Sequence, residues 1–243
     1  MNDSYSADHV KYIMGDINVY WINLDRSTDR KEILEKTLIE CNINNTRISA
    51  IDGKKINRED FQEKYNFATT VSLNEMACAM SHYKAIQTAY DNNDEYAIIM
   101  EDDCNFEYLK FKTKPILTLF NEMRCIGGEC LQLGLTCVKN TFNAMTSSTN
   151  EIFKGMDAGA IIYILSREAM KKILDRMNDK NSTKSVSEDN IFKTVKNYVA
   201  KPYFTYYFRD IVKSTIREPT KAAHATQTLS KIRWDNYYNN LIN

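Results

Sequence analysis

Ile98-Ile99-Met100-Glu101-Asp102-Asp103 is an apolar run that ends abruptly in three carboxylates. The run predicts a buried strand, and burying three like charges after it would cost several kcal/mol unless they are paired or bind a metal. Carboxylates at a strand end suit a hard divalent cation, which takes oxygen ligands and can then hold a phosphate. A solvent-exposed acidic turn that binds no metal would also explain Glu101-Asp102-Asp103. The apolar run before it favours a metal-dependent enzyme that acts on a phosphorylated donor.

The overall composition is that of an ordinary soluble globular protein. Apolar residues make up 43% and charged residues 26%, and 32 basic side chains balance 32 acidic ones. This balance argues against a chain that mainly coats nucleic acid, so we expect no nucleic-acid partner. The N-terminus is polar, and no run has the length of a transmembrane helix. We therefore expect no signal peptide, no transmembrane segment and a cytoplasmic location.

The cysteines indicate reduced thiols rather than a zinc ribbon. The six cysteines are Cys41, Cys78, Cys104, Cys125, Cys130 and Cys137. None forms a CxxC pair, which argues against a zinc ribbon. A chain of this length does not need disulfides, although the short spacing of the last three leaves one disulfide open.

Alternating strand-like and helix-like segments predict an α/β sheet with helices on both faces. Strands are expected at residues 17–22, 47–51, 96–100, 130–133, 158–165 and 203–208. Helices are expected at residues 28–41, 57–65, 72–90, 114–123 and 166–177. Loops are expected at residues 142–150 and 178–187, which are rich in polar residues.

Two sequences match the capping box, in which a serine precedes a helix and a glutamate follows three residues later. They are Ser72 with Glu75 and Ser185 with Glu188, and each predicts a helix start. The C-terminal segment is harder to assign, but its aromatic residues, Trp234 among them, predict that it docks onto the rest of the protein.

The polar loop after the first strand, residues 23–30, carries two arginines at the expected edge of the sheet. Arg26 and Arg30 could approach a phosphate or a ribose, and backbone amides at the next helix start could bind an anion. An ordinary polar loop explains the same residues and is the simpler interpretation. The sequence contains neither GxGxxG nor a Walker motif, so a dinucleotide or P-loop site lacks support.

The helix expected at residues 72–90 carries a cysteine and a histidine. Cys78 could be a nucleophile, but a small buried core cysteine is the more common role. Glu75 and His82 are seven residues apart and therefore lie on roughly one helix face. His82 is either a helix histidine with its own partners or a polar contact to substrate.

Three further residues have both a structural and a functional interpretation. Glu188 and Asp189 stand at a helix start, where carboxylates stabilise the helix by some tenths of a kcal/mol. Either carboxylate is also a candidate general base if it reaches an acceptor hydroxyl. His224 stands alone in the C-terminal segment, as a late metal ligand or as a surface or core histidine.

Several short segments follow one another in order between residues 18 and 191. They are Ile22-Asn23-Leu24-Asp25-Arg26 with Arg30, Ala50-Ile51-Asp52-Gly53, Glu75 with Cys78, Ser81 and His82, Ile99-Met100-Glu101-Asp102-Asp103, and Gly159 with Tyr163, Ser166 and Leu174. In this order they resemble glycosyltransferase family 25, the group of lipooligosaccharide and collagen hydroxylysine galactosyltransferases. Ala77 differs, because the family usually has glycine there.

The resemblance implies an α/β fold of the GT-A type, which binds nucleotide sugars on a central mixed sheet flanked by helices. It implies one such domain over residues 1–243, with a C-terminal extension from about residue 211. It also implies a UDP-sugar donor, usually UDP-galactose or UDP-glucose, with Mn²⁺ as cofactor and inversion at the sugar carbon. The residues implied to bind the nucleotide are Asn23, Leu24, Arg26, Arg30, Asp52, Gly53, Ser81, His82 and Asp102.

The same resemblance assigns roles to the acidic residues. Asp102 and Asp103 would hold the metal, and His224 is a further candidate ligand. We expect Glu101 to orient its neighbours rather than to contact the ion. Asp189 is the first candidate for the base that takes the acceptor proton, and Glu188 is the second.

The sequence thus predicts a Mn²⁺-dependent hexosyltransferase that acts on a glycan or a collagen-like hydroxylysine. A non-catalytic binding module on the same fold and a metal-dependent nucleotidyltransferase are the alternatives. We keep a homodimer open as a form of assembly. The bias towards Asn, Lys, Ile and Tyr is typical of an AT-rich genome, so we expect a bacterium or a virus-infected cell as the source.

Overall fold

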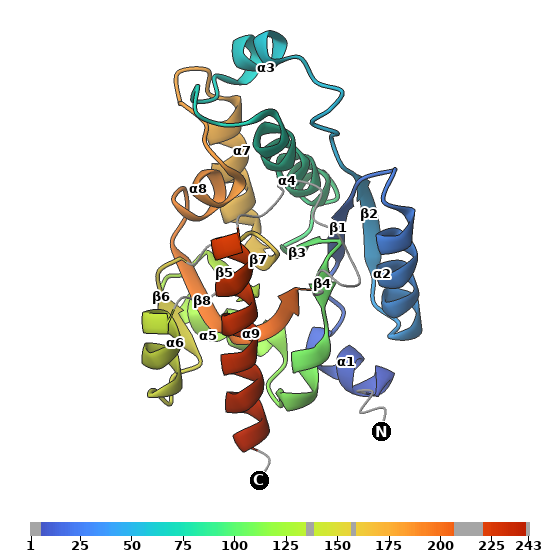
Figure 1. The fold of residues 1–243 in the computed structure, drawn as a ribbon, viewed down its shortest axis with the longest axis vertical. Coiled ribbons are helices and arrows are strands. Elements are labelled where there is room, and N and C mark those ends of the chain that lie inside the picture. The colour runs from blue at the N-terminus through green and yellow to red at the C-terminus, as the bar shows by residue number, and fades with distance from the viewer. Residues whose placement is uncertain (1–5, 135–138, 157–158, 207–220, 242–243) are drawn as a thin grey trace.

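The expected strands and helices form a mixed α/β architecture around one large sheet, shown in Figure 1. The computed structural model describes residues 6–134, 139–156, 159–206 and 221–241, and of residues 139–141, 206 and 221–227 only the backbone. The strands are β1 (Val19–Asn23), β2 (Asn45–Ser49), β3 (Tyr96–Glu101), β4 (Cys104–Asn105), β5 (Cys130–Gly134), β6 (Ile152–Lys154), β7 (Ile162–Ser166) and β8 (Asn197–Tyr206). The helices are α1 (Ala7–Met14), α2 (Thr28–Glu40), α3 (Arg58–Tyr65), α4 (Leu73–Asp91), the 3₁₀ helix η1 (Glu107–Phe111), α5 (Ile116–Cys125), α6 (Lys139–Thr146), α7 (Arg167–Asn178), α8 (Ser187–Phe192) and α9 (Lys221–Asn240).

The sheet contains both parallel and antiparallel pairs, which confirms the expected mixed sheet. Its strand order is β2-β1-β3-β7-β5-β8-β4, and β6 pairs with β8. β1 is parallel to β2 and β3, whereas β7 is antiparallel to β3 and β5. Because β1 and β3 are parallel neighbours, their last residues, Asn23 and Glu101, lie at the same edge of the sheet. Ligands of open α/β sheets bind at such an edge.

Two hydrophobic cores, one on each face of the sheet, confirm that helices cover both faces. Successive residues of a strand point to opposite faces. In β1, Val19 and Trp21 pack with α1, α2 and α5, while Tyr20 and Ile22 pack with α4, α7 and α8. All five residues of β1 are buried, which explains why the strand is apolar almost throughout.

Helix α4 begins at the capping box that the sequence predicts. The hydroxyl of Ser72 accepts a hydrogen bond from the N–H of Glu75 at 3.3 Å, and the Glu75 carboxylate accepts one from the N–H of Ser72 at 2.9 Å. A cap of this kind stabilises a helix by about 1 kcal/mol. The cap sets where α4 begins, and therefore which of its side chains face the edge formed by β1 and β3.

The loop expected at residues 142–150 is wrong in its first half, because α6 continues through Thr146. The ring of Phe142 contacts Trp234 edge-to-face with 4.9 Å between centroids, and Met145 is buried in the same cluster. Most of the stability of a short helix comes from tertiary packing. Apolar contacts with the distant C-terminal helix thus stabilise a helix that the polar local sequence did not predict.

The second predicted capping box, Ser185 with Glu188, is also wrong. The side chain of Asn190 accepts a hydrogen bond from the N–H of Ser185 at 2.9 Å and donates one to its carbonyl at 2.7 Å. The backbone of Ser185 is therefore already engaged. α8 starts at Ser187 with Val186 in the cap position and no side-chain cap.

Other elements also differ from the expectation, α1 and β8 among them. α1 was not predicted, although Ser6 caps it and Val10 and Ile13 are fully buried. β8 begins at Asn197, several residues before the predicted strand, because its first residues pair in parallel with β5. Both differences reflect packing partners that lie far away in the sequence.

Within the described ranges, no helix has the length and apolarity needed to cross a membrane. The described cysteines are free: Cys41, Cys78, Cys104, Cys125 and Cys130. Cys137 lies outside the described residues.

The C-terminal helix α9, drawn in red in Figure 1, docks as its aromatic residues predict. Trp234 and Tyr238 are buried against Tyr108. Lys112 lies beneath them, where its ammonium group donates to the hydroxyl of Tyr238 at 2.7 Å and to the carbonyl of Lys201 at 3.3 Å. Burial lowers the pKa of Lys112 to about 7.

The buried Lys112 predicts how stability depends on pH. Between pH 7 and 9 the unfolded chain keeps this lysine protonated while the folded chain releases the proton, so the free energy of unfolding rises with pH. The slope from this group is at most about 1.4 kcal/mol per pH unit. Lys112→Met should flatten the rise, measured by urea denaturation at pH 7, 8 and 9. Lys36→Met, at an exposed site, should leave it unchanged; an equal rise in both variants would contradict the prediction.

Candidate active site

An open pocket lies at the carboxyl ends of β1 and β3, and its volume of about 600 Å³ includes the solvent at its mouth. Its walls come from the loops after β1 and β2, the first half of α4 and the turn after β3. The lining residues are Ile22, Leu24, Arg26, Arg30, Ala50, Ile51, Gly53, Asn74, Ala77, Cys78, Ser81, His82, Glu101, Asp102 and Asp103. Most of the residues predicted to bind metal or nucleotide therefore meet in one place.

The guanidinium group of Arg30 holds the two carboxylates together. One of its nitrogens lies 2.5 Å from Asp102 and 2.9 Å from Asp103, and only 6% of the Arg30 side chain is exposed. Arg30 stands in the first turn of α2, so this ion pair ties that helix to the turn after β3. The arginine that the sequence suggested for phosphate contact is thus engaged by the acidic residues suggested for the metal.

Asn23 supports the carboxylate of Asp102 from outside the pocket lining. Its buried amide group donates to Asp102 at 2.6 Å and to the carbonyl of Ser27 at 3.1 Å. Its side-chain oxygen accepts from Arg47 at 2.7 Å. The sequence did not predict this role of Arg47. Its only indication there was a charged residue inside a predicted strand. Asn23 therefore orients Asp102 and does not line the pocket.

The electrostatics of the two aspartates fit a divalent cation. Burial raises the pKa of Asp102 to about 6 and that of Asp103 to about 7, although Arg30 lowers both. When all three carboxyls are ionised, Glu101, Asp102 and Asp103 face the single guanidinium group of Arg30, which leaves a net charge of −2. Oδ1 of Asp103 is buried and has no hydrogen-bond donor among the described residues. An oxygen of this kind, beside excess negative charge, is suited to ligate a hard ion such as Mn²⁺ or Mg²⁺.

The loop after β2 forms the rim of the pocket. Arg26 is ion-paired with Asp52 at 2.7 Å, so Asp52 positions the arginine and does not itself line the pocket. The hydroxyl of Ser81 accepts from the N–H of Ile51 at 2.9 Å and is therefore already used to fasten this loop to α4. A Cβ on Gly53 would lie 2.8 Å from the Cα of Asn74, so only glycine permits this close approach.

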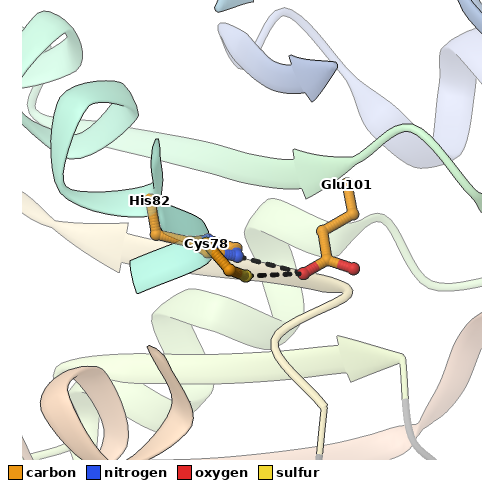
Figure 2. A group of neighbouring side chains, drawn as sticks. All are labelled: Cys78, His82 and Glu101. Carbon is orange, nitrogen blue, oxygen red and sulfur yellow. Dashed lines mark hydrogen bonds and ion pairs between the residues drawn. The ribbon is translucent and has the colours of Figure 1, made fainter. Parts of the chain in front are cut away.

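Cys78, His82 and Glu101 form a second cluster in the pocket lining, shown in Figure 2. His82 Nε2 lies 3.1 Å from Glu101 Oε1, and Cys78 Sγ lies 3.9 Å from the same oxygen. His82 Nδ1 lies 3.0 Å from the hydroxyl of Tyr163, which sequence reasoning left without a role. Although burial acts in the opposite direction, the hydrogen bond with His82 lowers the pKa of Glu101. Glu101 thus faces the pocket as an ionised group.

The acidic pair of α8 lies outside this lining. Asp189 is ion-paired with Lys193 at 2.8 Å. Glu188 accepts from the hydroxyl of Ser187 at 3.0 Å, and that hydroxyl lies 3.8 Å from the thiol of Cys78. Of the two carboxylates, Glu188 is therefore connected to the pocket through side-chain contacts. The side chain of His224 lies outside the described residues.

Arg30 predicts a stability effect that depends on pH. Arg30→Met should lower the free energy of unfolding by about 3 kcal/mol at pH 8, because it leaves the carboxylates of buried Asp102 and half-buried Asp103 without their cation. The loss should be smaller at pH 5, where both carboxyls, with folded pKa values of about 6 and about 7, take up protons.

Urea denaturation at the two pH values measures this difference. Arg26→Met is the matched control, because the Arg26 side chain is 39% exposed and exposed ion pairs contribute at most about 1 kcal/mol. An equal loss in the Arg30 variant at both pH values would contradict the role of the carboxylate charges.

Comparisons with known proteins identify relatives of this chain. Procollagen galactosyltransferase 2 of Homo sapiens is 26% identical over 180 residues, which are 66% of this chain and 28% of the relative. The Mus musculus protein of the same name is 29% identical over the same shares. A glycosyltransferase 25 family member of Aedes aegypti is 23% identical over 67% of this chain and 28% of the relative. The chain thus spans less than a third of the length of these relatives.

One solved structure and one family model complete the comparison. The crystal structure of a glycosyltransferase involved in the glycosylation of the major capsid of PBCV-1 aligns with 89% of this chain and 99% of its own, at a TM-score of 0.44 and 11% identity. The model described as glycosyltransferase family 25 (LPS biosynthesis protein) matches residues 16–192, which include the whole lining of the pocket. This match covers well over half of the chain and shows that the protein belongs to glycosyltransferase family 25.

Proposed function

We propose that the protein is a metal-dependent, inverting glycosyltransferase that moves a hexose from a UDP-sugar to an acceptor hydroxyl. The observation that carries this proposal is the pair of buried Asp102 and half-buried Asp103 directly after β3, at the edge where the parallel strands β1 and β3 end, with one carboxylate oxygen free of hydrogen bonds to any described residue. Membership of family 25 supports sugar transfer as the chemistry. Because the chain matches only part of its relatives, their activity supports the proposal without deciding it.

Galactose is the sugar we propose first. Two similar proteins are named as procollagen galactosyltransferases. A UDP-galactose donor and a hydroxylysine acceptor in a collagen-like segment therefore lead the candidates, with UDP-glucose and a glycan hydroxyl next. We propose that the C-terminal segment belongs to the same unit, since Trp234 and Tyr238 are buried against η1 and β8.

Asp102 and Asp103 would hold the cation, which when bound neutralises the negative charge of the leaving diphosphate. Mn²⁺ is the ion we propose, on the strength of the oxygen donor set. Asn23 fixes the orientation of Asp102, and Arg30 keeps both carboxylates in place and compensates part of their charge. Pre-organised carboxylates need little rearrangement when the donor arrives.

The other lining residues would bind and orient the donor. Arg26, held by Asp52, stands at the rim with its guanidinium group partly exposed and is suited to a phosphate oxygen. The loop of residues 50–53 is fastened to α4 through Ser81, which gives the nucleotide a rigid wall. The apolar side chains of Ile22, Leu24 and Ile51 supply a dry surface for a flat ring.

An inverting transfer needs a base for the proton of the attacking hydroxyl. We propose a carboxylate of α8 for this role. The contacts of Glu188 through Ser187 to Cys78 support Glu188, whereas the ion pair with Lys193 occupies Asp189. The sequence alone favoured Asp189 over Glu188, so the two carboxylates are tested together below.

Replacing one carboxylate of the pair should abolish metal-dependent transfer. Changing groups around a metal ligand costs about 10–100-fold, so Asp103→Asn should lower turnover by at least about 100-fold. UDP release from UDP-galactose and from UDP-glucose, with and without Mn²⁺, measures the effect. Asp175→Asn, at an exposed position on α7, is the matched control and should retain full turnover. Full turnover in the Asp103 variant would rule out the proposed site.

Two conservative variants separate the candidate bases. Removing a general base costs about 10²–10⁴-fold in rate. Glu188→Gln should therefore lower kcat by at least about 100-fold with little change in the KM for the donor. The pH profile of the remaining kcat should no longer show the fall that protonation of the base causes in the unaltered protein. Asp189→Asn should have the smaller effect. A larger loss in the Asp189 variant would transfer the role to Asp189.

A further inference from the structure

We propose that Cys78, His82 and Glu101 form a second metal site, selective for thiolate-binding divalent ions such as Zn²⁺ and separate from the oxygen-only pair Asp102 and Asp103. The sulfur, nitrogen and oxygen atoms of the three residues all lie within 4.8 Å of one another. In Figure 2 the three side chains converge from a helix and a strand end towards one point. The proposal rests on this geometry and does not depend on whether the protein transfers sugar.

The spacing of the three atoms approaches that of a tetrahedral zinc site. Zinc bonds of about 2.0–2.3 Å place neighbouring ligand atoms roughly 3.3–3.8 Å apart. Nε2 of His82 and Oε1 of Glu101 are 3.1 Å apart, and Sγ of Cys78 lies 3.9 Å from the same oxygen. Small rotamer adjustments would therefore admit the ion between them.

Two rigid elements hold these ligands in place. Cys78 and His82 are four residues apart on α4, so their side chains lie on the same face of the helix. Glu101 is the last residue of β3, which is paired on both sides within the sheet. A site built on a helix and a central strand loses little conformational entropy when it binds an ion.

Tyr163 gives His82 the outer contact that ligating histidines usually have. To ligate through Nε2, the neutral ring carries its proton on Nδ1, which lies 3.0 Å from the Tyr163 hydroxyl. That hydroxyl can accept as well as donate, so it serves either tautomer. On binding, Cys78 releases its thiol proton to solvent, and the ring of His82 takes the tautomer that carries its proton on Nδ1. The thiolate and the Glu101 carboxylate then balance the two charges of the ion.

The donor set distinguishes this site from the aspartate pair. Thiolate and imidazole ligands favour zinc and related ions, whereas carboxylate oxygens alone favour magnesium and manganese. Cys78 also differs from Cys41, Cys104 and Cys130, which are buried in the core, because its side chain lines the pocket. All three ligands line that pocket, so a fourth position on the ion is accessible to water. Three protein ligands with an open fourth position are typical of a catalytic rather than a structural zinc site.

Cobalt(II) is the probe that tests the proposal, because a thiolate bound to cobalt produces a charge-transfer absorption band. Titration of the whole protein with Co²⁺ should produce this band at one equivalent, and Zn²⁺ should displace it. Cys78→Ser should remove the band and weaken Zn²⁺ binding by at least about 100-fold in calorimetry. Cys125→Ser, at an exposed free cysteine, is the matched control and should retain both.

Further variants keep the outcome decisive. Glu101→Gln should weaken Zn²⁺ binding without removing the thiolate band, and circular dichroism checks that each variant is folded. Asp103→Asn should retain the cobalt band, which separates the two metal sites. No thiolate band in the unaltered protein, a band that survives Cys78→Ser, or a band lost in Asp103→Asn would each overturn the proposal.

Discussion

The ion pair of Arg30 with Asp102 and Asp103 is the interaction on which the pocket depends. Burying two carboxylates side by side costs several kcal/mol, and their raised pKa values reflect that cost. Arg30 offsets it and at the same time joins α2 to the turn after β3. Asn23 adds a neutral donor to Asp102. The protein can therefore keep excess negative charge in the pocket, which is what a cation site requires.

Helix α4 provides another wall of the pocket, and its polar contacts hold the neighbouring segments in place. Its capping box sets the first turn, Ser81 fastens the rim loop at Ile51, and His82 bonds to Glu101 at the end of β3. The apolar face of the same helix packs against β1 and β3 in the second core. The pocket is thus held between a strand edge and a helix that are both rigid. Such a frame suits the positioning of a donor and an acceptor.

The secondary structure was predictable where the signal is local. The buried run before Glu101 and the capping box at Ser72 depend on residues within one or two turns of each other, and both are confirmed. The helix over Lys139–Thr146 was not predictable, because its stability comes from packing on Trp234 in the distant α9. The capping box predicted at Ser185 is absent for a local reason instead, since the side chain of Asn190, five residues further along the chain, takes the backbone groups of Ser185.

By itself the sequence determined that a buried strand ends in carboxylates, that a capped helix precedes it and, through the order of its motifs, that the chain resembles family 25. Only the tertiary structure decided which groups meet. Arg30 reaches Asp102 and Asp103, and His82 reaches Glu101, because β1 and β3 pair in parallel and α4 packs across them. Strand pairing joins residues that lie far apart in the chain, and no local spacing encodes those distances.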